Sequence, residues 1–150
     1  VLILLISTRR EGLPPSRTFC QVLLDQARSE DVRAEVLFAQ AMVETGGCSS
    51  AETWTGTAKC SAISEDWGNG NGVAGEEFPD VKTGLLAQAQ HLKGYASTAP
   101  LNQSCVDTRF GLLAGKRGSA PTVDKLSGTW AADKTYGTKV MNVVDKLLGY

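Results

Sequence analysis

Apolar residues recur every three or four positions in four stretches of the chain, which is the spacing of one face of an α-helix. A first helix is expected over TFCQVLLDQARSE, residues 18–30, after the prolines and serine at 14–16. Another opens at Pro79 and Asp80, which suit a helix N-terminus, and runs to Ala96. A terminal helix is expected from near Asp133. A short helix over 107–114, followed by a glycine-rich linker, completes a mainly helical pattern.

The helix expected over residues 31–44 differs from the others because apolar side chains cover most of its circumference. Such a helix is expected to be buried. Its one polar stripe is formed by Arg33, Gln40 and Glu44, which project within about 40° of each other at 100° per residue. The pair Gly46 and Gly47 suits the end of this helix.

Residues 48–78 have a different composition, rich in Gly, Ser, Thr, Asn and acidic residues. The GNGNG run at 68–72 is typical of hairpin turns, so we expect a loop-rich region with a small irregular β ribbon. The apolar run from Val1 to Ile6 is expected to form a short buried strand, because six residues are too few to cross a bilayer.

Length and charge narrow the possible functions. A chain of 150 residues suits one domain, here 1–150, and we expect a monomer. A formal net charge of -1 provides no global field that would attract nucleic acid or an anionic membrane. One histidine and no CxxC pair make a zinc site improbable, and no metal or organic cofactor is expected.

Four cysteines are widely spread along the chain. They are expected to form two disulfides in an exported protein, although four buried thiols in a cytosolic protein are the alternative. Cys48 and Cys60 bracket one Gly/Ser/Thr-rich stretch and are the favoured pair. That choice leaves Cys20 to pair with Cys105.

Glu44 is the candidate for chemistry, because it lies in the last turn of an apolar helix just before the glycines. A carboxyl at that position borders a cleft. Partial burial disfavours the ionised form and is expected to raise the pKa of Glu44 from about 4.3 towards neutrality, as a general acid requires. The alternative is a structural role, in which Glu44 pairs with Arg33 or caps a neighbouring element.

Four segments occur in an order that resembles a known family: AEVLFAQAMVETGG, GEEFPDVKTGLLAQAQHLKGYA, LNQSCVDTRF and GTWAADKTYGTKVMNVVDKL. Together they are similar to the glucosaminidase domain of bacterial autolysins and phage-like lysins, glycoside hydrolase family 73 of the lysozyme superfamily. The resemblance covers roughly residues 30 to 150. It implies a lysozyme-like α+β fold, mainly helical, in which the loop lobe from about Cys48 to Phe78 faces the helical lobe across a glycan groove.

The resemblance also implies an activity and a location. The activity is hydrolysis of the β-1,4 bond between N-acetylglucosamine and N-acetylmuramic acid in peptidoglycan glycan strands, by a secreted or cell-wall associated protein. Glu44, in the helix-terminal ETG motif, would be the catalytic acid, and Tyr136 would lie at the sugar subsite beside it. A glycosidic oxygen is a poor leaving group, so a carboxylic acid must protonate it as positive charge builds on the sugar.

The second catalytic participant stays open at this point. Glu65 and Asp66 in the loop lobe are candidates, followed by Glu76 and Glu77, although all four could be solvated loop charges. The substrate's own acetamido group could assist instead. Residues 59–64 depart from the Asn-Phe-Ala-Gly-Ile-Gly-like segment usual in the family, which puts the sugar subsites in question.

Further residues are expected at the glycan groove or away from it. Gln40, Glu77, Trp67 and Trp130 are candidates for substrate binding, the two tryptophans by stacking on sugar faces. Tyr95 is expected in the core, whereas the surface or the cleft edge is expected for His91, Gln88 and Gln90. Two other functions remain open: a lytic transglycosylase or muramidase that uses the same glutamate, and a non-catalytic peptidoglycan-binding or phage-tail module.

Overall fold

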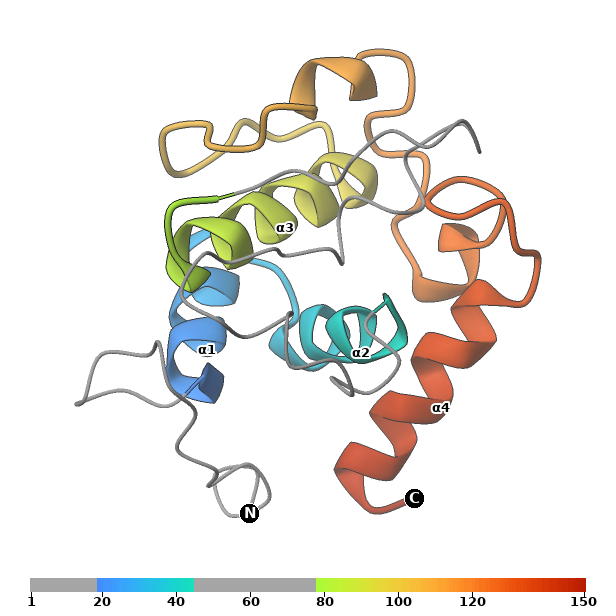
Figure 1. The fold of residues 1–150 in the computed structure, drawn as a ribbon. Helices are drawn as coiled ribbons and strands as arrows, with labels where there is room; N and C mark the ends of the chain where they lie inside the picture. Colours follow the sequence, from blue (N-terminus) through green and yellow to red (C-terminus); the bar gives the residue numbers. More distant parts are fainter. Residues whose placement is uncertain (1–18, 45–77) are drawn as a thin grey trace.

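The structure is a computed structural model that describes residues 19–44 and 78–150. Its elements are α1 (Phe19–Ser29), α2 (Ala34–Glu44), α3 (Val81–Ala96), η3 (Phe110–Leu113), η4 (Val123–Leu126) and α4 (Tyr136–Leu148). Figure 1 shows α2 between α1 and α4, with α3 packed across α1. The four long helices confirm the prediction of a mainly helical fold. The expected strand at 1–6 and the loop lobe up to residue 77 lie outside the described residues.

Helix α1 ends where the chain turns sharply towards α2. Asp31 has a φ of 58°, in the left-handed region that aspartate enters more easily than most residues. This conformation lets the Val32 N–H donate to the carbonyl of Ala27 at 2.9 Å, which closes the last turn of the helix. The turn places α2 directly against α1.

Helix α2 is buried as its sequence predicted, since every residue from Val36 to Ala41 is less than 10% exposed. Its polar end is stabilised locally, because Arg33 donates hydrogen bonds and forms an ion pair with Glu35. Arg33 therefore pairs with Glu35, and not with Glu44 as considered from the sequence.

Helix α3 begins as expected, with Asp80 as its N-cap. The Asp80 carboxylate accepts hydrogen bonds from the Thr83 N–H at 2.7 Å and the Thr83 hydroxyl at 2.8 Å. The helix lies between α1 and η3 (Figure 1), and both pack against it. For this reason nearly its whole circumference is buried, including polar residues from Gln88 to Lys93.

In the segment after α3, the short helix expected over 107–114 is the 3-10 turn η3, and a second 3-10 turn, η4, lies where a linker was expected. The segment also contains an isolated β-bridge between Ser127 and Ala131. Helix α4 packs closely on η4, since a Cβ added to Gly137 would lie 2.6 Å from the carbonyl oxygen of Val123. This close approach fixes where α4 starts.

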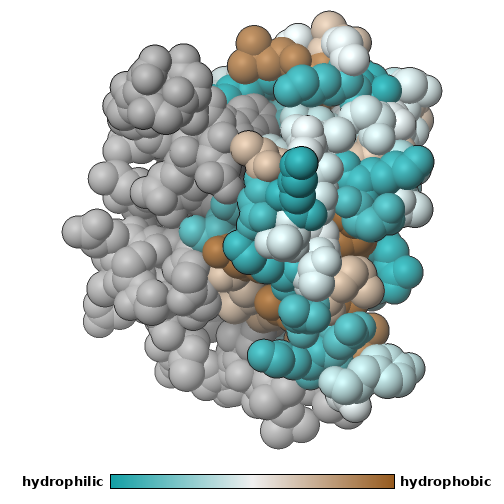
Figure 2. Space-filling model, turned by 90° about the vertical axis from the view of Figure 1, so that its right-hand side faces the viewer, coloured by the Kyte–Doolittle hydropathy of each residue, from teal (hydrophilic) through white to brown (hydrophobic). Residues whose placement is uncertain are grey.

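The C-terminal helix is amphipathic, with Tyr136, Val140 and Val144 buried and its other face exposed. Figure 2, which views the molecule from the side of α4, shows a mainly hydrophilic surface with small separate hydrophobic patches. Met141 and Leu148 are among the large apolar side chains exposed there. Within residues 19–44 and 78–150, the helices are too short or too polar to cross a membrane.

The structure contradicts the expected disulfide between Cys20 and Cys105, because both are free thiols. Cys20 is buried in the core on α1, where burial raises the pKa of its thiol. Cys105 is exposed, and its Sγ donates to the Asp107 carbonyl at 3.4 Å. Cys48 and Cys60 lie outside the described residues, so their pairing stays a prediction.

Candidate active site

Glu44 ends α2 beside the start of α4 and is only partly buried. One of its carboxylate oxygens, Oε1, accepts two hydrogen bonds from side chains at or just before the start of α4. The Tyr136 hydroxyl donates at 2.5 Å, and the Trp130 indole Nε1–H donates at 3.3 Å. Two residues more than 80 positions away in sequence therefore converge on the predicted acid. Hydrogen bonds donated to a carboxylate favour its ionised form and also fix its orientation.

Tyr136 is itself held in place by a buried amide. The Gln40 Nε2–H donates to the Tyr136 hydroxyl oxygen at 3.4 Å, and Gln40 is fully buried one helical turn before Glu44. The Oε1 atom of Gln40 has no hydrogen-bond partner among the described residues. Gln40, proposed from sequence as a substrate-binding residue, thus contacts the tyrosine that contacts the acid.

Trp130 lies in an aromatic cluster rather than on an open surface. Its side chain is 4% exposed, and its neighbours are His91, in a T-shaped contact with ring centroids 5.3 Å apart, and Tyr95, tilted at 5.6 Å. Tyr95 is buried as expected, and its hydroxyl donates to the carbonyl of Thr129 at 3.1 Å. The indole therefore presents its N–H edge to Glu44 while its faces are packed.

The polar residues of α3 that were expected at the surface are buried, which corrects that prediction. His91, Gln88 and Gln90 are each 1% exposed or less. The Gln88 amide donates to the Leu37 carbonyl on α2 at 3.3 Å. Sequence periodicity missed these positions because α3 is surrounded on nearly all sides, and a single apolar stripe understates the burial of such a helix.

Gln90 connects α3 to the segment that follows it. Its Oε1 accepts from the backbone N–H of Val106 at 2.9 Å and of Asp107 at 3.2 Å, while its Nε2 donates to Glu30. Glu30 also accepts from the Lys93 ammonium at 3.2 Å. These bonds attach the end of α1 and the loop after α3 to one buried helix.

The Glu30 carboxylate accepts hydrogen bonds from two side chains and from two backbone N–H groups. Its burial alone would raise the pKa, but the backbone N–H of Asn102, the amide of Gln90, the backbone N–H of Gln103 and the ammonium of Lys93 outweigh burial and lower the pKa. A carboxylate so fully bonded inside the protein supports structure and does not face a substrate.

His91 and Asp107 form a second buried polar pair. The His91 Nδ1 lies 2.6 Å from the Asp107 Oδ2, and both side chains are at most 2% exposed. Burial lowers the pKa of His91, and the hydrogen bond to Asp107 partly opposes that effect. The pair was not predicted, although the chain's one histidine in a helix rich in apolar residues was the available signal.

Several predicted site residues lie outside the described ranges: Glu65, Asp66, Trp67 and Glu77, with Glu76 beside the last. The described residues therefore place one candidate acid, Glu44, with Tyr136, Trp130 and Gln40 around it. The partner of the acid stays a prediction.

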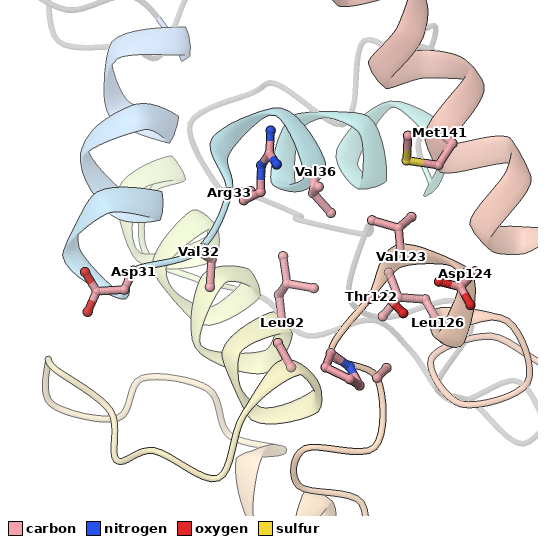
Figure 3. Close-up of a pocket in the computed structure, with 13 residues that line it drawn as sticks. Asp31, Val32, Arg33, Val36, Leu92, Thr122, Val123, Asp124, Leu126 and Met141 are labelled. Carbon is pink, nitrogen blue, oxygen red and sulfur yellow. The ribbon is translucent and has the colours of Figure 1, made fainter.

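A pocket of about 560 Å³ lies at the opposite end of α2. Figure 3 shows that it is bounded by Val32 just before α2, by Val36 in the first turn of α2, by Leu92 on α3 and by Met141 on α4. Val36 is eight residues from Glu44, which is about 12 Å along a helix axis. The pocket is lined mostly by apolar groups and does not include Glu44, so the candidate active site is distinct from it.

Comparisons with known proteins give a fold and one sequence relative. No family model matches the chain. An uncharacterised protein of Borreliella burgdorferi is 35% identical over 138 residues, which is 89% of this chain, and the chain spans 63% of that relative's length. The crystal structure of the catalytic domain of the autolysin Auto from Listeria monocytogenes aligns with a TM-score of 0.54 at 19% identity, covering 91% of this chain and 89% of that one. The chain has the mainly helical, lysozyme-like fold of this neighbour.

Proposed function

We propose that the protein is a peptidoglycan hydrolase, an endo-β-N-acetylglucosaminidase that uses Glu44 as its general acid. The observation that carries the proposal is the arrangement around the Glu44 carboxyl, which receives the Tyr136 hydroxyl and the Trp130 indole N–H on one oxygen. The shared fold with an autolysin catalytic domain and the resemblance of the ETG segment support the same function.

The two donors suggest how Glu44 acts. Because both donors aim their hydrogens at Oε1, a proton on the carboxyl belongs on Oε2, from which it can pass to the glycosidic oxygen. As the proton leaves, negative charge develops on the carboxylate, and the hydrogen bonds from Tyr136 and Trp130 strengthen. Interactions that strengthen in the transition state accelerate the reaction.

The other participant in the reaction comes from the loop lobe or from the substrate. An inverting enzyme would use a loop carboxylate such as Glu65 or Asp66 as a base about 6.5–9.5 Å away, and a retaining enzyme would place it at about 5–5.5 Å. Assistance by the acetamido group of the substrate would leave Glu44 as the one indispensable carboxyl. Amide variants of all four loop candidates distinguish these cases: Glu65→Gln, Asp66→Asn, Glu76→Gln and Glu77→Gln. Acetamido assistance predicts that all four keep activity.

A zymogram tests the catalytic role of Glu44. Wild type is expected to clear a gel that contains peptidoglycan, and Glu44→Gln is expected to clear none. Glu35→Gln is the matched control, because Glu35 lies on the same helix but pairs with Arg33. Failure of wild type to clear several wall types would favour the non-catalytic binding module.

The products decide which bond is cleaved. A digest reduced with borohydride and analysed by mass spectrometry is expected to carry N-acetylglucosamine at its reducing ends. Reducing N-acetylmuramic acid would indicate a muramidase, and anhydromuramic ends would indicate a lytic transglycosylase. An activity on the wall also requires a secreted or cell-wall associated protein, which cell fractionation can test.

A further inference from the structure

Trp130 can orient Glu44 only if the indole itself is held. One of its ring neighbours, His91, carries a polar group that packing alone does not require. The imidazole contacts the indole edge to face, with 67° between the planes, and contacts Tyr95 in the same way at 5.3 Å. A phenylalanine would fill this space with a lower desolvation cost. The histidine therefore calls for a role beyond filling volume.

The far side of His91 is fixed by Asp107. The Asp107 Oδ2 lies 2.6 Å from His91 Nδ1, while its Oδ1 accepts from the Arg109 N–H at 2.9 Å. The Asp107 backbone N–H in turn donates to Gln90 on α3. The carboxylate is thus anchored at both oxygens and at its main chain, so it can fix the rotation of the imidazole ring.

The protonation of the ring follows from the same contacts. Burial lowers the pKa of His91, the charges of Arg109 and Lys116 act in the same direction, and Asp107 opposes them. The imidazole is therefore neutral at pH 7, with its proton on Nδ1 where the carboxylate accepts it. A neutral ring with a fixed tautomer is a rigid surface for the indole.

We propose that His91, held by Asp107, is a positioning residue for Glu44: it fixes the plane of Trp130 so that the indole N–H meets the carboxyl. This inference rests on the proposed hydrolase function for its effect on rate, but its structural part can be tested independently. The connection runs from Asp107 to His91 by a hydrogen bond, to Trp130 by ring contact, and to Glu44 by a second hydrogen bond.

The first test is kinetic and uses His91→Phe, which keeps an aromatic ring but loses the link to Asp107. On soluble peptidoglycan glycan chains, kcat is expected to fall about tenfold with KM unchanged. The variant misaligns the hydrogen bond from Trp130 to Glu44, which would otherwise strengthen as charge develops on the carboxylate in the transition state. Leu85→Ala, another buried α3 change, is the matched control and is expected to lower stability without lowering kcat. An unchanged kcat in a folded His91→Phe protein would overturn the proposal.

The second test does not need activity. In a protein labelled with ¹⁵N-tryptophan, the Trp130 indole signal is the one lost in Trp130→Phe, and Glu44→Gln is expected to shift it. In a His91→Phe background, Glu44→Gln should shift this signal by less than it does in wild type, whereas in a Leu85→Ala background the shift should be unchanged. If wild type fails to cleave peptidoglycan, the proposed function falls, but this spectrum still decides whether His91 positions the indole.

Asp107→Asn provides a second variant in case His91→Phe does not fold. The amide keeps the size of the carboxyl but loses its charge, so the His91 ring loses its preference for the Nδ1–H tautomer. Because the chain has one histidine, a ¹⁵N imidazole spectrum reports His91 alone. A changed tautomer is expected together with a displaced indole signal, and a changed tautomer without that displacement would contradict the proposal.

Discussion

The Tyr136 hydroxyl donates the shorter of the two hydrogen bonds described at the proposed acid, so its removal gives the most direct prediction. Tyr136→Phe deletes the donor 2.5 Å from Glu44 Oε1 and keeps the buried ring. A hydrogen bond to a charged group contributes about 1.5–3 kcal/mol. If all of this is expressed in the transition state, kcat falls by about tenfold to 150-fold.

Tyr136→Phe is also expected to lower the stability of the protein. Gln40, fully buried, loses the oxygen to which its Nε2 donates. A buried donor left unsatisfied costs about 1–3 kcal/mol, so Tyr136→Phe is expected to lower the free energy of unfolding by that amount. In the Tyr136→Phe background, Gln40→Leu removes an amide whose Nε2 has already lost its acceptor and whose Oε1 has no bond to lose among the described residues.

The double variant separates catalysis from stability. Tyr136→Phe/Gln40→Leu is expected to regain most of the lost stability in urea unfolding followed by circular dichroism, since both partners are then apolar. Its kcat, from the clearing rate of a peptidoglycan suspension, should stay as low as that of Tyr136→Phe. Recovery of kcat together with stability would refute the reasoning, because the hydroxyl would then act on folding and not on Glu44.

The pH dependence of kcat provides an independent test, because the direction of its change follows from the hydrogen bonds at Glu44. A donor to Glu44 Oε1 favours the ionised carboxyl, so its loss favours the protonated acid. The alkaline limb of the kcat profile is therefore expected to move to higher pH in Tyr136→Phe and, through the same oxygen, in Trp130→Phe. A limb that stays in place in both variants would remove Glu44 as the titrating acid.

Three further predictions concern the supporting structure. Glu30→Gln removes the negative charge that pairs with the buried ammonium of Lys93 and should cost about 3–5 kcal/mol at pH 7 in urea unfolding. Because the folded pKa of Glu30 is lowered from 4.5, this difference should shrink as pH falls below about 4.5. The pKa of His91 is lowered from 6.5, so wild type should lose stability as pH falls from 6.5 to 5, and His91→Phe should not show this loss. Gly137→Ala should lower stability by about 1–3 kcal/mol and reduce activity, because the added Cβ meets backbone atoms of η4 at 2.6 and 2.8 Å. The Cβ added in Gly94→Ala meets the flexible end of the Leu113 side chain instead. Thermal melting should therefore show a smaller loss of stability than for Gly137→Ala.

Hydrophobic periodicity predicted the four long helices because each carries a strong local signal. The Asp80 cap and the apolar face of α4 are readable from a few neighbouring residues, and both are confirmed. The turn η4 was missed because it depends on packing against α4, where Gly137 allows the close approach. Such contacts have no local pattern.

In the candidate site, too, some residues could be predicted from local sequence and others depend on packing between elements. Glu44 was identified from its place in a buried helix, and Tyr136 from the resemblance of its segment to a family. The roles of Gln40, Trp130 and His91 depend on the meeting of α2, α3 and the start of α4, which spacing along one helix does not encode. A buried polar residue that bonds across elements looks, in sequence, like one at the surface.

The placement of Glu44 on α2 also has a consequence for motion. Every residue of α2 from Val36 to Ala41 is buried, and amide hydrogens in such a helix exchange with solvent only when large parts of a protein open. We therefore expect the proposed acid to be attached to a slowly exchanging helix. Heating should abolish activity at the same temperature at which the fold melts, with no earlier loss from local fraying around the acid.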